Sequence, residues 1–153
     1  MEKTLVILKP SAMLRGLAGE VISRFEKKGL IIIGMKMMNL SDEILAEHYS
    51  HLADKPFFPL IVNSMQASPV VVMCVKGLDA VNVVRKMTGA TKGRNAELGT
   101  IRGDLCMSGQ QNIVHASDSP ENAEVEIRRF FKPEEICDYD TPIIKMLYAD
   151  DEL

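Results

Sequence analysis

His115 is the residue of this sequence best placed for nucleophilic or proton-transfer chemistry. It follows a short apolar stretch and precedes a predicted helix start at Ser119, where a serine cap, a proline and an acid occur in order. The positive end of a helix disfavours an imidazolium, so a histidine at this place can stay neutral and nucleophilic. The alternative is a histidine that only fills the core or caps the helix, which is the commoner role of a single histidine.

Three carboxylates that follow His115 in the sequence are candidates to assist it. Glu126 flanks the apolar face of the predicted last helix, where a partly buried carboxylate could accept the ring N–H of His115 and orient it. Glu124 lies on the opposite flank, and helix geometry does not choose between the two. Asp118 could join a hydrated metal ion or simply help to cap the helix.

A basic segment between Arg85 and Arg102 is the best candidate for binding an anion. It holds five cations and one acid, in a chain whose net charge is −3. By its spacing, Arg85 falls inside the apolar stripe of its helix, so it must be paired or reach the rim of the protein. Guanidinium groups bind phosphate with two hydrogen bonds. The alternatives are a structural salt bridge for Arg85, an Arg102–Asp104 pair at a turn, and a merely solvated loop.

The remaining histidines and aromatic residues carry weaker signals. His48 and His51 share a predicted helix with Tyr49, and surface positions are expected for both. Phe57 could offer a ring that stacks on a base, although adjacent phenylalanines more often fill a core. The sequence contains no phosphate-binding P-loop, no dinucleotide-binding glycine motif, no zinc helix and no serine nucleophile elbow.

Buried strands are predicted where Val, Ile, Leu and Met cluster without polar alternation. Helical periodicity lies between these segments and suggests one sheet covered by helices. The stretch from 89 to 111 has weak periodicity and is long enough to be a functional loop. The predicted strands are Thr4–Lys9, Leu30–Met38, Pro69–Val75 and the shorter Asn112–His115. Four helices are predicted. The first includes Leu17–Phe25, and the second runs from a cap at Ser41 to about Leu52. The third includes Leu78–Val84 and ends near Gly89, and the fourth begins at Ser119.

Composition indicates one globular domain spanning 1–153, with 46% hydrophobic and 25% charged residues. No apolar run approaches the roughly 20 residues that span a bilayer, so no membrane partner is expected. The three cysteines are odd in number and widely spaced, which favours a reducing cytoplasm. The acidic total charge argues against a protein that binds nucleic acid. Binding of nucleic acid by the positive loop is kept as a weaker hypothesis.

Several motifs resemble nucleoside diphosphate kinases over almost the whole length of the chain. Two stretches are highly specific, Gly99-Thr100-Ile101-Arg102-Gly103-Asp104 and Asn112-Ile113-Val114-His115-Ala116-Ser117-Asp118-Ser119. The others are Ile7-Leu8-Lys9-Pro10, Arg15-Gly16-Leu17, Phe25-Glu26 with Lys28-Gly29, His48-Tyr49 and Pro56-Phe57-Phe58-Pro59.

The resemblance implies an α+β, ferredoxin-like sandwich with a four-stranded antiparallel sheet, assembled as a homo-oligomer of six or four copies. It implies ping-pong transfer of the γ-phosphoryl group from a nucleoside triphosphate to a nucleoside diphosphate through a phosphohistidine. Magnesium would travel with the nucleotide, bound mainly by phosphates and water, with Asp118 contacting it through water and no dedicated metal ligands.

The same resemblance assigns roles to individual residues. His115 would be the nucleophile. The nucleotide would be bound by Lys9 and Asn112 at the ribose hydroxyls and a nearby phosphate oxygen, by Arg85, Thr91 and Arg102 at the distal phosphates, and by Phe57 at the base. Tyr49 would lie beside the transferred group, and Glu126 and Ser117 would support the histidine.

The sequence departs from the family pattern at Ser11-Ala12, Lys92-Gly93, Leu98, Gly109-Gln110-Gln111 and Ala116. None removes a chemical group of the implied site, and they bear on base-side packing, loop stability and subunit contacts. The substitutions around Ser11, Gly109 and Ala116 also motivate a second hypothesis of another class, a nucleotide-binding regulatory or scaffold protein that has lost turnover.

Overall fold

The computed structural model describes residues 1–153 and contains one sheet of four strands. The strands are β1 (Glu2–Leu8), β2 (Ile31–Met38), β3 (Val70–Gly77) and β4 (Val114–Ala116), in the order β2-β3-β1-β4. All three pairings are antiparallel. The expected α+β, ferredoxin-like fold with a four-stranded antiparallel sheet is therefore confirmed.

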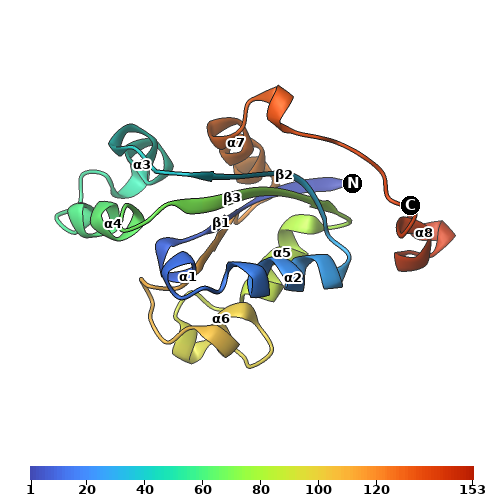
Figure 1. Cartoon of the computed structure of the whole chain (residues 1–153), viewed down its shortest axis with the longest axis horizontal. Helices are drawn as coiled ribbons and strands as arrows, with labels where there is room; N and C mark the ends of the chain where they lie inside the picture. The colour runs from blue at the N-terminus through green and yellow to red at the C-terminus, as the bar shows by residue number, and fades with distance from the viewer.

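Helices cover both faces of this sheet, with α3 and α7 on one side and α2, α5 and α6 on the other (Figure 1). The helices that the periodicity predicts are present, and short ones occur where no periodicity could show them. The bounds are α1 Pro10–Leu14, α2 Ala18–Lys28, α3 Asp42–His48, α4 Phe58–Met65, α5 Ala80–Thr88, α6 Ile101–Leu105, α7 Pro120–Phe130 and α8 Ile144–Leu147, with 3-10 turns η1 Ser50–Leu52, η2 Gly93–Asn95, η3 Pro133–Glu135 and η4 Asp150–Glu152.

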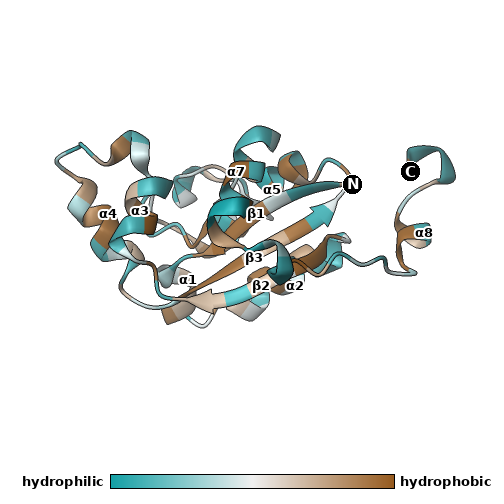
Figure 2. Ribbon diagram, turned by 90° about the horizontal axis from the view of Figure 1, so that it is seen from above, coloured by the Kyte–Doolittle hydropathy of each residue, from teal (hydrophilic) through white to brown (hydrophobic).

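Side chains of β1 alternate between two apolar clusters, one on each face of the sheet. Leu5 and Ile7 pack with Leu45 and Phe130 beneath α3 and α7. Val6 and Leu8 belong to the opposite cluster, which includes Phe25 of α2. Burying such a side chain contributes about 1.5–3 kcal/mol. Both faces must therefore be apolar, which is why most of β3 and the part of β1 away from the N-terminus are brown in Figure 2 and lack polar alternation.

Caps and stops define the ends of the longer helices. The hydroxyl of Ser41 accepts from the N–H of Ile44, and that of Ser119 accepts from the N–H of Asn122. Gly29 ends α2 with φ of 99°, a conformation that glycine adopts without strain. The helix after Ser41 is shorter than expected, because the regular turns stop at His48 and a 3-10 turn follows.

The chain beyond α7 continues along the edge of the sandwich, where Phe131 and Ile136 pack on the apolar cluster and the N–H of Cys137 donates to the carbonyl of Ile33 at 2.7 Å. It passes through η3 and runs to α8 and the C-terminus at the far end of the molecule (Figure 1). None of the helices combines the length and the apolar composition needed to cross a bilayer.

Candidate active site

A backbone irregularity just before His115 places that residue on β4. Ile113 has φ of 61°, a conformation that costs a β-branched residue about 1–3 kcal/mol. Two contacts hold it: its N–H donates to Oγ of Ser11 at 3.1 Å, and its carbonyl accepts from the N–H of Lys9 at 2.9 Å. The extended backbone therefore begins at Val114, later than the predicted Asn112, and His115 pairs with Ile7 of β1.

His115 forms a pair with Glu126 of α7. Its Nε2 lies 2.8 Å from Oε2 of Glu126, and the hydroxyl of Ser117 donates to the same oxygen at 2.8 Å. Burial acts to raise the pKa of Glu126, but these hydrogen bonds and the interaction with His115 outweigh it, so its pKa is lowered. The ionised carboxylate fixes the proton of a neutral His115 on Nε2. Nδ1 then keeps its lone pair and has no hydrogen-bond partner in the protein.

The choice between the two glutamates is thus resolved by contacts. Glu124 lies on the outside of α7, where it pairs with Arg128. Of the two, only Glu126 reaches the histidine.

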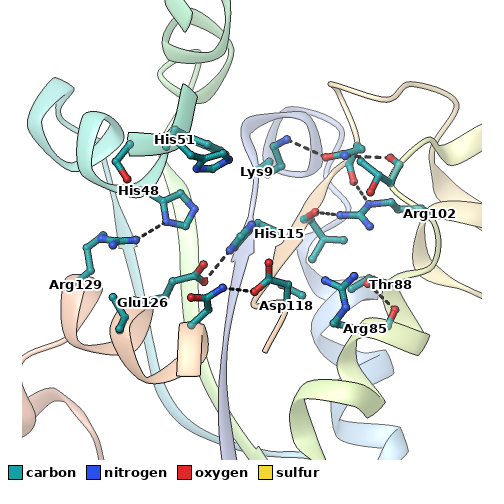
Figure 3. Close-up of a pocket in the computed structure, with 18 of the residues that line it drawn as sticks. Lys9, His48, His51, Arg85, Thr88, Arg102, His115, Asp118, Glu126 and Arg129 are labelled. Atoms are coloured by element: carbon teal, nitrogen blue, oxygen red, sulfur yellow. Dashed lines mark hydrogen bonds and ion pairs between the residues drawn. The ribbon is translucent and has the colours of Figure 1, made fainter. Parts of the chain in front are cut away.

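A cavity of about 670 Å³ opens beside His115. Its lining includes Lys9, Arg85, Arg102 and Arg129, together with all three histidines of the chain. In Figure 3, Arg85 and Arg102 lie on one side of His115, whereas His48 and Arg129 lie on the other. This distribution of positive charge suits an anionic ligand with several phosphate groups.

Lys9 and Asn112 are joined at one edge of the cavity. Nζ of Lys9 donates to the side-chain oxygen of Asn112 at 2.8 Å and to the carbonyl of Gln110 at 3.0 Å. The amide nitrogen of Asn112 donates to the carbonyls of Thr91 and Gly109. Burial, with a smaller effect of Arg102, lowers the pKa of Lys9 to about 8. A buried ammonium of this kind is stabilised when an anion arrives.

The two arginines of the predicted anion site differ in their surroundings. Arg102 is only 9% exposed, and its guanidinium donates to the carbonyls of Asn112, Gly89 and Val114 at 3.2, 2.9 and 2.5 Å. The proposed pair of Arg102 with Asp104 is absent, since Asp104 pairs with Arg24.

Arg85 is exposed at the rim of the cavity, one of the two positions expected for it, but it does not lie inside the apolar stripe as its spacing suggested. The predicted stripe included Leu78, but that residue lies in the turn before α5. The buried face of the helix is formed by Ala80, Val81, Val84 and Thr88, which leaves Arg85 at its edge. Its guanidinium makes no ion pair within the protein and is free to bind an anion.

His48 corrects the expectation of a surface histidine. It is 8% exposed, and its ring meets the ring of His115 edge-on, with centroids 4.6 Å apart. Tyr49 also lines the cavity, and burial, reinforced by Glu126, raises its pKa to about 12. His51 is exposed as expected. The default expectation failed because α3 ends at His48, whose side chain turns under the helix toward β4 and α7.

Phe57 lies apart from the residues that line the cavity. It occupies the position before α4 and is 47% exposed, so it is not a core plug. Two hydrogen bonds connect α4 to the segment before His115: Gln111 donates to Oγ of Ser64, and Gln110 donates to the carbonyl of Leu60. Gln111, one of the departures from the family pattern, thus has a structural role.

Oxygen donors that could face a metal ion are few. Asp118 lines the cavity and is exposed, and its carboxylate accepts from Asn122. One such carboxylate fits a magnesium ion bound mainly by phosphates and water. His48, His115 and Glu126 bring one donor atom each within 4.8 Å of one another. The neighbouring guanidinium of Arg129 and the existing His115–Glu126 hydrogen bond disfavour a divalent cation there.

An antiparallel α+β sandwich, with a cation-lined cavity around a histidine–carboxylate pair, defines an enzyme that binds an anionic, phosphate-bearing substrate. Comparison with known proteins gives the family. The family model described as nucleoside diphosphate kinase matches residues 2–136. The chain belongs to the nucleoside diphosphate kinase family, and its enzyme class is that of these nucleotide-binding kinases.

Individual relatives agree over nearly the full length. A nucleoside diphosphate kinase of Parabacteroides distasonis is 61% identical over 152 residues, which cover 99% of each chain. That of Methanothermobacter thermautotrophicus is 47% identical over 150 residues, covering 98% of this chain and 100% of the relative. The solved structure of the Halobacterium salinarum enzyme in complex with CDP superposes with a TM-score of 0.93 at 39% identity, covering 97% of this chain and 99% of that one.

Proposed function

We propose that this chain transfers the γ-phosphoryl group of a nucleoside triphosphate to a nucleoside diphosphate in two half-reactions, through a phosphohistidine at His115. One observation carries this proposal: Nε2 of His115 is held by Glu126, while Nδ1 is left without a partner beside a cation-lined cavity. A nucleophile needs both an oriented ring and an open lone pair.

In the first half-reaction, the lone pair of Nδ1 attacks the γ-phosphorus. The bond from that phosphorus to the β–γ bridging oxygen breaks, and the nucleoside diphosphate leaves with the electron pair. In the second, a terminal β-phosphate oxygen of the acceptor attacks the same phosphorus, and the P–N bond returns its electrons to Nδ1. Glu126 stabilises the positive charge on the ring while it carries the phosphoryl group.

The cavity residues divide the remaining work. Arg85 binds the distal phosphates directly, because its guanidinium is exposed and unpaired. Arg102 supports the same phosphates with its charge while its hydrogen bonds hold the cavity wall. Lys9 binds a phosphate oxygen and, with Asn112, the ribose hydroxyls. We further propose that Thr91 contacts the distal phosphates, Tyr49 lies beside the transferred group and Phe57 stacks on the base.

Asp118 would contact, through water, a magnesium ion bound to the nucleotide, and that ion would neutralise part of the phosphate charge. We also propose that residues 1–153 act as one catalytic domain in the cytoplasm, that six or four copies assemble, and that nucleic acid is not a partner. Light scattering of the purified chain distinguishes the two assemblies from each other and from a monomer.

Incubation with a γ-labelled nucleoside triphosphate tests the function. We expect acid-labile label on intact protein, and its complete transfer to a nucleoside diphosphate carrying a different base. Label that is not discharged, or nucleotide binding without label, would reject the proposal. Nucleotide binding without label would instead support the hypothesis of a regulatory protein without turnover.

The lowered pKa of Lys9 predicts a pH dependence of nucleotide binding. Lys9 is charged below about pH 8 and loses its proton as the pH rises through that value, well before an ordinary lysine. We expect the affinity for a nucleoside diphosphate to fall above that pH, by up to about tenfold per pH unit for one linked proton. Calorimetric titration without magnesium from pH 7.5 to 9.5 measures this effect.

Lys9→Arg is the control for this measurement, because a guanidinium stays charged throughout the range. Its affinity is expected to show no such fall. An equally flat profile for the unmodified protein would contradict the assignment of Lys9 to the phosphate-binding set.

A further inference from the structure

His48 is buried against the proposed nucleophile and has no place in the mechanism above. Its ring meets His115 at 4.6 Å and Phe130 at 5.3 Å between centroids, with interplanar angles of 80° and 79°. Its Nε2 is buried without a hydrogen-bond partner. An unsatisfied buried donor costs about 1–3 kcal/mol, so its retention beside His115 calls for a functional explanation.

Arg129, one turn after Glu126 on α7, contacts the other nitrogen of this ring. Its Nη1 lies 3.1 Å from Nδ1 of His48, and its Nε lies 3.1 Å from a carboxylate oxygen of Glu47. The Arg129 side chain is 12% exposed. A guanidinium only donates hydrogen bonds, so Nδ1 of His48 must accept. The proton of the neutral His48 ring is therefore on Nε2.

The surroundings of His48 also keep it uncharged. Burial, which has the largest effect, and repulsion from His115 lower the pKa of His48 to about 3. Arg129 and His51 lower it further, whereas Glu126 acts to raise it. A protonated His48 would place a second imidazolium within 4.8 Å of the Glu126 carboxylate. It would compete with His115 for that carboxylate and release the ring of the nucleophile. The charged or titratable groups that face His48 are His115 of β4, Glu126 and Arg129 of α7, Glu47 of α3, Tyr49 and His51.

We propose that Arg129 and His48 are positioning residues for the phosphoryl transfer: Arg129 fixes the tautomer of His48, and the His48 ring holds the ring of His115 with Nε2 on Glu126 and Nδ1 open to the cavity. This inference rests on the proposed function, since it assigns the two residues to the support of that nucleophile. The arrangement is visible on the left of the cavity in Figure 3, where Arg129, His48 and His115 follow one another. Arg129 has no role in the family resemblance, and its only sequence signal is its spacing of three residues from Glu126.

Nuclear magnetic resonance of the full chain with 15N-labelled histidine tests the tautomer without any enzyme assay. We expect His48 to show a protonated Nε2, a bare Nδ1 and no titration between pH 5 and 8, the window of an ordinary histidine at about 6.5. In Arg129→Met, which keeps an apolar stem and removes the donor, the two tautomers should mix. A protonated Nδ1 in the unmodified protein, or an unchanged His48 spectrum in Arg129→Met, would overturn the proposal.

Arg128→Met is the matched control. Arg128 neighbours Arg129 but pairs with Glu124 on the exposed side of α7. The control should leave both the His48 spectrum and kcat unchanged. A change equal to that of Arg129→Met would show a general effect of charge and overturn the specific role of Arg129.

A kinetic comparison tests the positioning role of the ring. We expect His48→Ala to lower kcat by about ten- to a hundredfold with KM nearly unchanged, because a misplaced nucleophile loses rate more than binding. His48→Phe keeps an aromatic ring against His115 but leaves Arg129 without its acceptor, so it should recover part of this rate, even if the alanine variant folds poorly. Full activity of His48→Ala, or no recovery with His48→Phe in a folded protein, would reject the role. Absence of label on His115 in the unmodified protein would instead reject the proposed function and leave the tautomer result standing.

Discussion

His115→Ala is expected to take no label from a γ-labelled nucleoside triphosphate and to lose at least about a thousandfold in phosphate exchange. The change removes Nδ1 of His115, whose lone pair attacks the γ-phosphorus in the proposed mechanism. The cations of the cavity can still bind a nucleotide, but they cannot accept its phosphoryl group. Nucleotide binding should therefore survive. Mass measurement of the intact protein after acid and neutral quenching, together with calorimetric binding, separates these two effects.

His51→Ala is the control for this variant. His51 lines the same cavity but is exposed and makes no contact with Glu126. It should be labelled and discharged as the unmodified protein is. Persistent labelling of His115→Ala, or loss of label in His51→Ala alone, would show that the phosphoryl group is carried elsewhere.

The strands and the main helices could be predicted because each depends on local sequence. Three of the four strands are runs of branched and apolar residues that fill both faces of a sheet, and Ser41 and Ser119 cap their helices in the structure as their sequences indicate. Antiparallel pairing came from the family resemblance, because strand composition does not encode direction. The shift of the fourth strand could not be predicted, since it depends on the left-handed conformation of Ile113 held by Ser11.

The candidate site was predicted in part. His115 and Glu126 meet as proposed, because a helix that begins after the strand folds back over it. The apolar stripe around Arg85 and the surface position of His48 were predicted wrongly for the same reason: the faces of α5 and α3 are set by where each helix begins and ends. The role of Arg129 depends on contacts with α3, which are distant in sequence, and no spacing within α7 reveals them.

Arg102→Ala is expected to destabilise the fold by about 2–5 kcal/mol. Three backbone carbonyls would lose their donor, and each buried unsatisfied group costs about 1–3 kcal/mol, less whatever water restores. These carbonyls belong to Gly89 at the end of α5, to Asn112 before β4 and to Val114 of β4 itself, the strand that carries His115. Loss of the guanidinium therefore loosens the cavity wall and also removes a positive charge from the cavity. Urea unfolding followed by circular dichroism measures the stability, and nucleotide KM measures the site.

Arg85→Ala provides the contrast, because its guanidinium is exposed and makes no ion pair in the protein. Its stability should stay within about 0.5 kcal/mol of the unmodified protein. Its KM should rise by about ten- to a hundredfold, the effect of losing a hydrogen bond to a charged phosphate worth about 1.5–3 kcal/mol. Equal losses of stability in both variants would contradict the assignment of a structural role to Arg102 and of a purely ligand-binding role to Arg85. Arg102→Ala could instead be as stable as the unmodified protein and only bind nucleotide less tightly. Arg102 would then be a direct ligand of the phosphates. Its hydrogen bonds to the three carbonyls would have to break when nucleotide binds.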